Sequence, residues 1–126
     1  MSDESEGRSP LPIHLQHAAA LARYVSAVQR GEIAWHGEDS VDSHVTAVQV
    51  LAQYIASQGE AGREPSCDRA QMELLEMVGK ALVHDGMYRL THFDQSSPDP
   101  AEAHRRLISG KQLLAFLKTL SRPAAK

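Results

Sequence analysis

The chain has little cysteine and few aromatic residues, and each shortage excludes a class of protein. Cys67 is the only cysteine among its 126 residues, so an intrachain disulfide framework is excluded. A lone cysteine is also consistent with a reducing compartment, and we expect a cytoplasmic protein. Aromatic residues make up only 5% of the chain. We therefore expect a core built from Leu, Val, Ile, Ala and Met side chains.

Long apolar runs and an excess of basic charge are missing too. No run approaches the roughly 20 apolar residues of a membrane-spanning helix. The N-terminus is acidic and polar, which is unlike a secretory signal. The formal net charge is −3, whereas nucleic-acid-binding domains usually carry a basic face. We therefore expect neither a membrane nor a nucleic acid as a partner.

The length and the composition divide the chain into one domain and two tails. A chain of 126 residues is typical of a single domain. Residues 1–9 form an acidic, polar tail that cannot bury apolar surface, so we expect it to be disordered. Residues 10–121 form the predicted helical domain, and residues 122–126 form a short basic tail.

Two amphipathic stretches in the first half of the chain predict helices. Over residues 13–30, apolar side chains recur at spacings of three and four without Gly or Pro, and Gly31 suits the C-terminal cap. Residues 40–58 show the same spacing, with a good N-cap in Ser40 and an end at Gly59. Trp35 lies in the connection, where it either plugs one end of the core or contacts a partner. We favour the plug, because a large aromatic side chain is usually mostly buried.

A third helix is predicted in the second half of the chain. Ser66 or Asp68 suits its N-cap, and we expect the helix to end before Gly86. Gly79 in its middle lowers helix propensity, so we expect it to permit close contact with another helix. Residues 87–94 fit neither a helix nor a strand cleanly. We expect an irregular or one-turn segment there.

The last predicted helix, residues 99–120, has the clearest start and the most apolar surface. Asp99 and Glu102 have the spacing of a capping box. The apolar side chains sweep roughly half of the helical cylinder, whereas a surface helix needs a stripe of about 100°. This excess predicts that the helix packs on its own domain and also on a partner or a second copy. We assign that interface to Leu113, Phe116, Leu117 and Leu120.

Four amphipathic helices with short connections predict an all-α fold, a four-helix bundle-like single domain with short loops. The chain contains no Gly-rich phosphate loop, Gly-x-Ser-x-Gly elbow or Cys-x-x-Cys pair. We therefore predict a non-catalytic interaction module without a cofactor. It would be a small regulator or inhibitor, of the anti-activator or immunity type, that masks a surface of a transcriptional regulator or an enzyme. An adaptor or a chaperone fits the same features. We also expect a homodimer formed through the last helix.

An alternative function rests on three residues of the middle helices. His44 lies near the start of the second predicted helix, and the pair His84-Asp85 lies near the end of the third. This arrangement resembles the first half of the HD-type metal phosphohydrolases, in which a His and a His-Asp pair on successive helices bind a divalent metal. The resemblance implies that His44, His84 and Asp85 are metal ligands. That family also uses a distant downstream Asp, and the last Asp of this chain is Asp99.

His14 and His17 suggest a second way to bind a metal. They lie three residues apart on the first predicted helix. The Glu and His of Glu-x-x-His motifs share a helix face in the same way in carboxylate metal bundles, and Glu residues of other helices complete those sites. Glu73 and Glu76 are the nearest match for such residues here, and the chain has no Glu-x-x-His motif. We therefore expect boundary or solvated histidines, and no bound metal.

Overall fold

The structure is a computed structural model that describes residues 12–92 and 100–121. Those residues form four helices and no strand: α2 (Ile13–Gln29), α3 (Val41–Glu60), α4 (Arg69–Thr91) and α5 (Pro100–Ser121). The predicted all-α, bundle-like fold is confirmed. Both predicted tails, residues 1–9 and 122–126, lie outside the described residues. None of the described helices is long and apolar enough to span a membrane.

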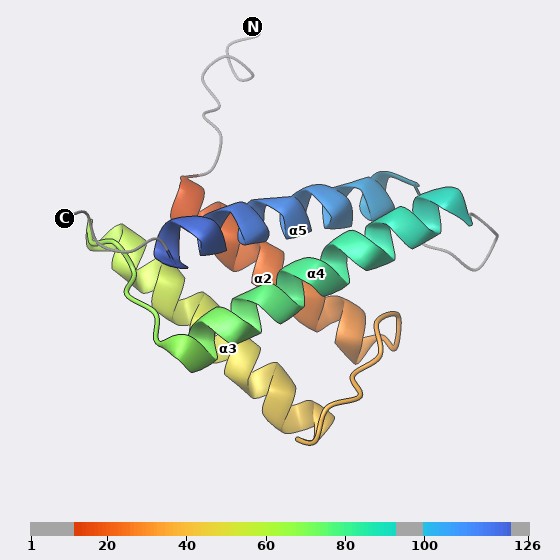
Figure 1. Cartoon of the computed structure of the whole chain (residues 1–126), viewed down its shortest axis with the longest axis horizontal. Helices are drawn as coiled ribbons and strands as arrows, with labels where there is room; N and C mark the ends of the chain where they lie inside the picture. Colours follow the sequence, from red (N-terminus) through yellow and green to blue (C-terminus); the bar gives the residue numbers. More distant parts are fainter. Residues whose placement is uncertain (1–11, 93–99, 122–126) are drawn as a thin grey trace, which may run out of the picture.

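The helices form two antiparallel pairs that cross each other (Figure 1). In one pair α2 packs along α3, and in the other α4 packs along α5, which is the most extensive contact between elements. Figure 1 shows α2 passing behind α4, and α2 contacts both α4 and α5. The helix α2 therefore joins the two pairs.

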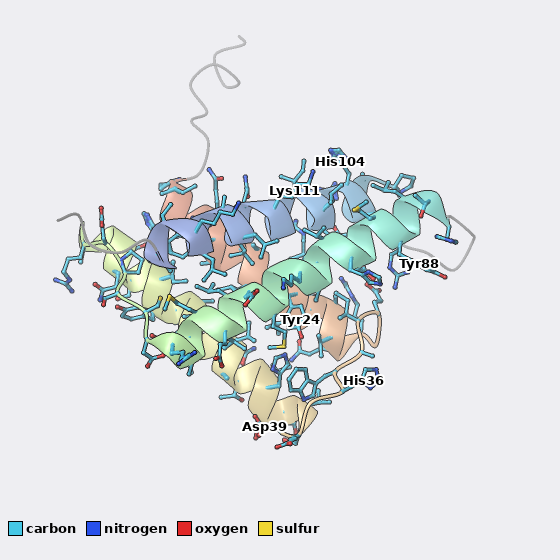
Figure 2. The ribbon with its side chains drawn as sticks, viewed as in Figure 1. Tyr24, His36, Asp39, Tyr88, His104 and Lys111 are labelled. Carbon is cyan, nitrogen blue, oxygen red and sulfur yellow. The ribbon has the colours of Figure 1, made fainter. Side chains whose placement is uncertain are left out.

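The core is mainly aliphatic, as the low aromatic content predicts. Its most deeply buried aliphatic side chains come from all the described helices and are Leu21, Val48, Leu51, Ile55, Leu75, Val78, Leu82 and Leu113. Burying one such large side chain stabilises the fold by about 1.5–3 kcal/mol relative to leaving it in water. Tyr24 is buried among them (Figure 2).

Three glycines allow α4 and α5 to pack closely. A Cβ atom at Gly86 would lie 2.6 Å from the carbonyl oxygen of Ala103, and one at Gly110 would lie 2.6 Å from the carbonyl oxygen of Gly79. Both distances are shorter than those at which Cβ atoms occur, so a side chain at either position would push the helices apart. The close contact predicted at Gly79 is confirmed.

Two of the predicted helix ends are wrong. The helix α3 continues through Gly59, and the turn after it is made by Gly62, with a φ of 76°. The helix α4 continues through Gly86, so the segment 87–94 is helical as far as residue 91, and residues 93 and 94 lie outside the described part. Both glycines provide space instead of ending a helix. At Gly59 a Cβ atom would lie 1.9 Å from the ring of His14.

The other predicted helix ends are confirmed where the structure describes them. Gly31 follows α2 with a φ of 77°, a conformation that favours glycine. The Ser40 side chain accepts a hydrogen bond from a backbone amide in the first turn of α3. Asp68 and Gln71 form a capping box at the start of α4. The predicted cap of the last helix involves Asp99, which lies outside the described residues.

Candidate functional site

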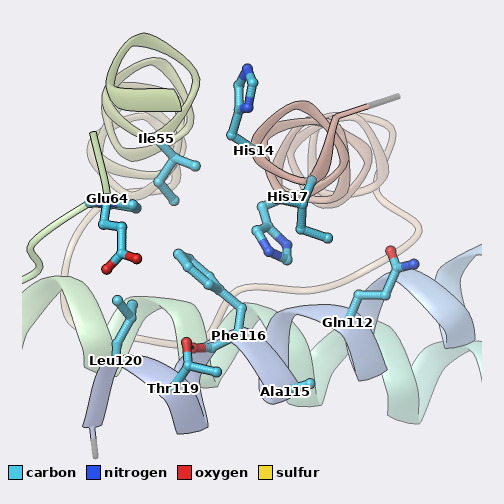
Figure 3. Close-up of a pocket in the computed structure, with 11 residues that line it drawn as sticks. His14, His17, Ile55, Glu64, Gln112, Ala115, Phe116, Thr119 and Leu120 are labelled. Atoms are coloured by element: carbon cyan, nitrogen blue, oxygen red, sulfur yellow. Dashed lines mark hydrogen bonds between the residues drawn. The ribbon is translucent and has the colours of Figure 1, made fainter. Parts of the chain in front are cut away.

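An open cleft lies between the start of α2, the end of α5, and the end of α3 with the loop that follows it (Figure 3). Its volume is about 530 Å³, which is within the usual range of ligand pockets. The apolar part of its lining consists of Ile13, Ile55, Pro65, Ala115, Phe116 and Leu120. The polar part consists of His14, His17, Glu64, Gln112 and Thr119.

The predicted interface residues of α5 are divided between this cleft and the core. Phe116 and Leu120 are half-buried and line the cleft. Leu117 is half-buried against the core, and Leu113 is 0% exposed within it. The Leu113 side chain is therefore not accessible to a partner. Much of the wide apolar arc of α5 packs against other helices of the same chain, because α5 contacts both α4 and α2.

His17 is a buried polar residue on the α2 side of the cleft. It is only 5% exposed, and its ring stacks on the ring of Phe116 with the centroids 4.1 Å apart. Burial, and secondly the nearby His14, lower the pKa of His17, so its ring is mostly neutral at pH 7. Its Nδ1 atom has no hydrogen-bond partner among the described residues. Leaving such a buried polar atom unpaired costs about 1–3 kcal/mol.

The polar residues nearer the mouth of the cleft differ in their contacts. Gln112 donates a hydrogen bond from Nε2 to Oε1 of Gln16 over 3.3 Å. Figure 3 shows the Glu64 side chain on the other side of the cleft from His17. Glu64 is exposed, and nothing among the described residues pairs with its carboxylate. The cleft therefore combines an apolar lining with one acidic group at its edge.

The sequence contained a signal for the burial of His17 that the sequence analysis did not use. His17 precedes the buried Leu21 by four residues, so it continues the buried stripe of α2. The expectation of a boundary position holds for His14, which is half-buried. The position of His17 in the stripe indicates burial, but it does not indicate which groups surround the ring.

The three residues of the HD-type resemblance are not brought together as a metal site. His44 is buried, with its Nε2 atom 2.7 Å from the hydroxyl of Tyr24. Trp35 stacks on His44 with the ring centroids 3.7 Å apart. His84 is exposed on α4. Within residues 12–92 and 100–121, no group of three or more His, Cys, Asp or Glu side chains is close enough to hold a metal ion.

Trp35 and His44 close one end of the α2–α3 pair. Trp35 is half-buried, and its indole N–H donates to the carbonyl oxygen of Asp39 over 2.9 Å. Burial lowers the pKa of His44, and the nearby Asp39 raises it by a smaller amount. Figure 2 shows Asp39 at the edge of the molecule, in the α2–α3 connection, and Tyr24 in its interior. Trp35 therefore covers a buried polar pair beside the core.

Arg106 is a buried charged residue that the sequence analysis missed. Its side chain is 1% exposed, and its guanidinium pairs with three carboxylates. It donates to Asp85 of α4 over 2.7 Å and to Glu102 of α5 over 3.1 Å. It also donates to Glu32 of the α2–α3 connection. Asp85, a candidate metal ligand in the HD-type resemblance, is thus held by Arg106 and also by Arg89.

The Arg106 cluster links three parts of the fold through one charged group. Burial alone would lower the pKa of Arg106, but the hydrogen bonds to Asp85, Glu32 and Glu102 outweigh burial and raise it. The guanidinium therefore stays charged inside the domain. Ala103, Arg106 and Leu113 are all buried at helical spacing, and that spacing was the available signal for a buried arginine.

Comparison with known proteins does not assign the chain to a family. No protein-family model, no curated protein and no solved structure matches it. Because one fold supports many functions, the function has to be argued from the geometry and chemistry of the cleft.

Proposed function

We propose that the chain is a non-catalytic helical module that binds an apolar segment of a partner protein in the cleft between α2 and α5. The observation that carries this proposal is the lining of the cleft, in which half-buried Phe116 and Leu120 face about 530 Å³ of open space. Apolar surface gathered in a concave site is typical of binding sites. Amphipathic helices dock into such grooves through apolar side chains at positions i, i+3 and i+4.

The contacts of His17 support binding in preference to catalysis. An activated nucleophile needs a base within hydrogen-bond reach. The ring of His17 packs on Phe116 instead, and its Nδ1 contacts no hydroxyl, thiol or carboxylate among the described residues. In this proposal the module acts by occupancy, as an anti-activator or an immunity-type inhibitor would, and covers a surface of a regulator or an enzyme.

The proposal can be tested by filling the cleft without disturbing the core. Ala115 is exposed and lines the cleft, so Ala115→Trp adds a large side chain at its mouth. Ala101→Trp is the matched control, because Ala101 is exposed near the other end of the same helix. Affinity capture from the native host should recover the same protein with the wild type and with Ala101→Trp. Recovery of that protein should fall strongly with Ala115→Trp.

Equal recovery with Ala115→Trp would show that the cleft is not the docking site. Circular dichroism and thermal unfolding of both variants should match those of the wild type. A variant that fails this check is replaced by Thr119→Trp, because Thr119 is exposed and also lines the cleft.

We also propose that the chain self-associates through the same face as a two-fold dimer. In the absence of the partner, a second copy would cover Phe116 and Leu120, and binding of the partner would displace that copy. Thr119→Glu, at the exposed rim, should then shift sedimentation velocity from dimer to monomer without loss of helical signal. A wild-type chain that sediments as a monomer at about 100 μM would exclude a dimer of useful affinity.

A further inference from the structure

We propose that the partner anchors its segment in the cleft with a tyrosine side chain whose hydroxyl bonds to Nδ1 of His17. This inference rests on the proposed function, because the cleft must first be a docking site. It adds the chemistry of the group that the cleft selects, which the apolar lining alone does not specify.

The unpaired nitrogen of His17 indicates that the ligand carries a polar atom. His17 is 5% exposed and lines the cleft, and Nδ1 has no partner among the described residues. An apolar ligand would bury the cleft further and leave that atom unpaired. A ligand with a hydrogen-bonding group aimed at His17 removes the cost of the unpaired atom and gains selectivity over apolar competitors.

The neutral state of the ring favours a hydroxyl over a charged group. A neutral imidazole carries its proton on one of two nitrogens, and a hydroxyl can donate to a bare Nδ1 or accept from a protonated one. A carboxylate would lose its hydration in an apolar cleft that has Glu64 at its edge. Burying an ammonium group beside His17 would carry the same desolvation cost. A neutral hydroxyl avoids the cost of desolvating a charge.

The surroundings of the nitrogen favour an aromatic carrier for that hydroxyl. The ring of Phe116 stacks on His17 with the planes inclined by 19°, and Ile55 and Leu120 also line the cleft. Phe116 is half-buried and lines the cleft, so part of its ring is open to contact with an entering phenol ring. Aromatic pairs and the apolar body of tyrosine suit such a place, with the polar tip on a partner.

The edge of the cleft adds a preference for charge near the anchor. The Glu64 carboxylate is exposed and has no ion pair among the described residues. A lysine or arginine close to the anchoring tyrosine would place its positive charge near Glu64. Such a rim pair contributes more to the association rate and specificity than to affinity.

The test compares two small probes that differ only in the hydroxyl group. 4-Methylphenol has the shape of the tyrosine side chain, and toluene has that of phenylalanine. Both are titrated against the full chain and followed by NMR chemical shifts of Phe116 and His17. 4-Methylphenol should bind about two- to tenfold more tightly than toluene, the fold-change expected for one net hydrogen bond. The Nδ1 resonance of His17 should move further with 4-methylphenol than with toluene, because both probes pack beside Phe116 and only 4-methylphenol forms the hydrogen bond.

Variants assign the difference between the probes to His17. His17→Phe keeps a ring that can stack on Phe116 but removes the nitrogen, and it should abolish the preference for 4-methylphenol. His104→Phe, a change of the same type at an exposed position outside the cleft, should keep the preference. If His17→Phe does not fold, the Nδ1 resonance of the wild-type chain decides the question.

The inference is overturned if the two probes bind equally, if neither binds, or if the preference survives in His17→Phe. These outcomes are separate from failure of the proposed function. If Ala115→Trp blocks the partner while the probes bind alike, the cleft docks its partner through apolar contacts and the tyrosine anchor is wrong. If Ala115→Trp leaves the partner bound, the docking site itself is wrong.

Discussion

At the scale of single residues, Arg106 tests whether the buried charge cluster holds the domain together. Replacing Arg106 by Met leaves Asp85, Glu32 and Glu102 without their shared cation. Breaking a buried pair from one side typically costs about 3–5 kcal/mol. Because Arg89 still pairs with Asp85 and Arg23 with Glu102, Arg106→Met should lower the free energy of unfolding in urea by about 3 kcal/mol, the lower end of that range. Arg105→Met is the control, because Arg105 is exposed and should cost less than about 1 kcal/mol. Equal effects of the two substitutions would contradict a structural role for the cluster.

The two buried histidines predict how stability depends on pH. The pKa values of His17 and His44 are lowered from 6.5 in the folded chain, in both cases mainly by burial. Below pH 6.5 the unfolded chain therefore binds more protons at these positions than the folded chain does. The histidine contribution to stability is fully present above that pH and is lost as the pH falls.

Urea unfolding at a series of pH values should show this loss directly. The free energy of unfolding should fall as the pH drops from about 7.5 to 5.5. His17→Phe should reduce the slope, because it removes one of the two groups. A stability that stays flat or rises on acidification would contradict the burial of both rings in neutral form.

At the scale of the elements, the glycines of α4 and α5 predict an order of substitution effects. Gly86→Ala and Gly110→Ala place a methyl group 2.6 Å from backbone oxygens, so each should destabilise the fold by about 1–3 kcal/mol or more. Gly79→Ala meets the flexible Leu114 side chain at 2.9 Å and the carbonyl oxygen of Gly110 only at 3.2 Å, a milder contact that the helix propensity gained with alanine, about 1 kcal/mol at each of the three positions, offsets more fully. Urea unfolding should therefore show a smaller loss for Gly79→Ala than for the other two.

The helices themselves could be predicted, but some of their ends could not. The three-and-four spacing of apolar residues identified all the described helices, and the caps at Ser40 and Asp68 followed from local chemistry. Gly59 and Gly86 were interpreted as helix ends, because glycine looks the same whether the chain turns there or another element packs there. The neighbour that needs the space, such as His14 at Gly59, is set by tertiary packing.

At the scale of the whole molecule, the candidate site could be predicted only in part. The apolar excess of α5 placed Phe116 and Leu120 on a candidate binding face, and both line the cleft. The same pattern could not separate them from Leu113, because the positions of α2 and α4 decide which side chains are covered. The neutral, unpaired ring of His17 depends on groups far apart in the sequence. The sequence therefore predicted the α5 residues that line the cleft, but it did not predict the buried, unpaired ring of His17.

The proposed docking of a partner protein in the cleft between α2 and α5 can be examined by site-specific photocrosslinking in the native host. The photoreactive residue is placed either at Thr119 or at His104. Thr119 is exposed on the rim of the cleft, and His104 is exposed on the outer side of the same helix (Figure 2). We expect a discrete crosslinked protein from position 119 and none from position 104. Crosslinking of the same protein from position 104 alone would contradict docking in the cleft.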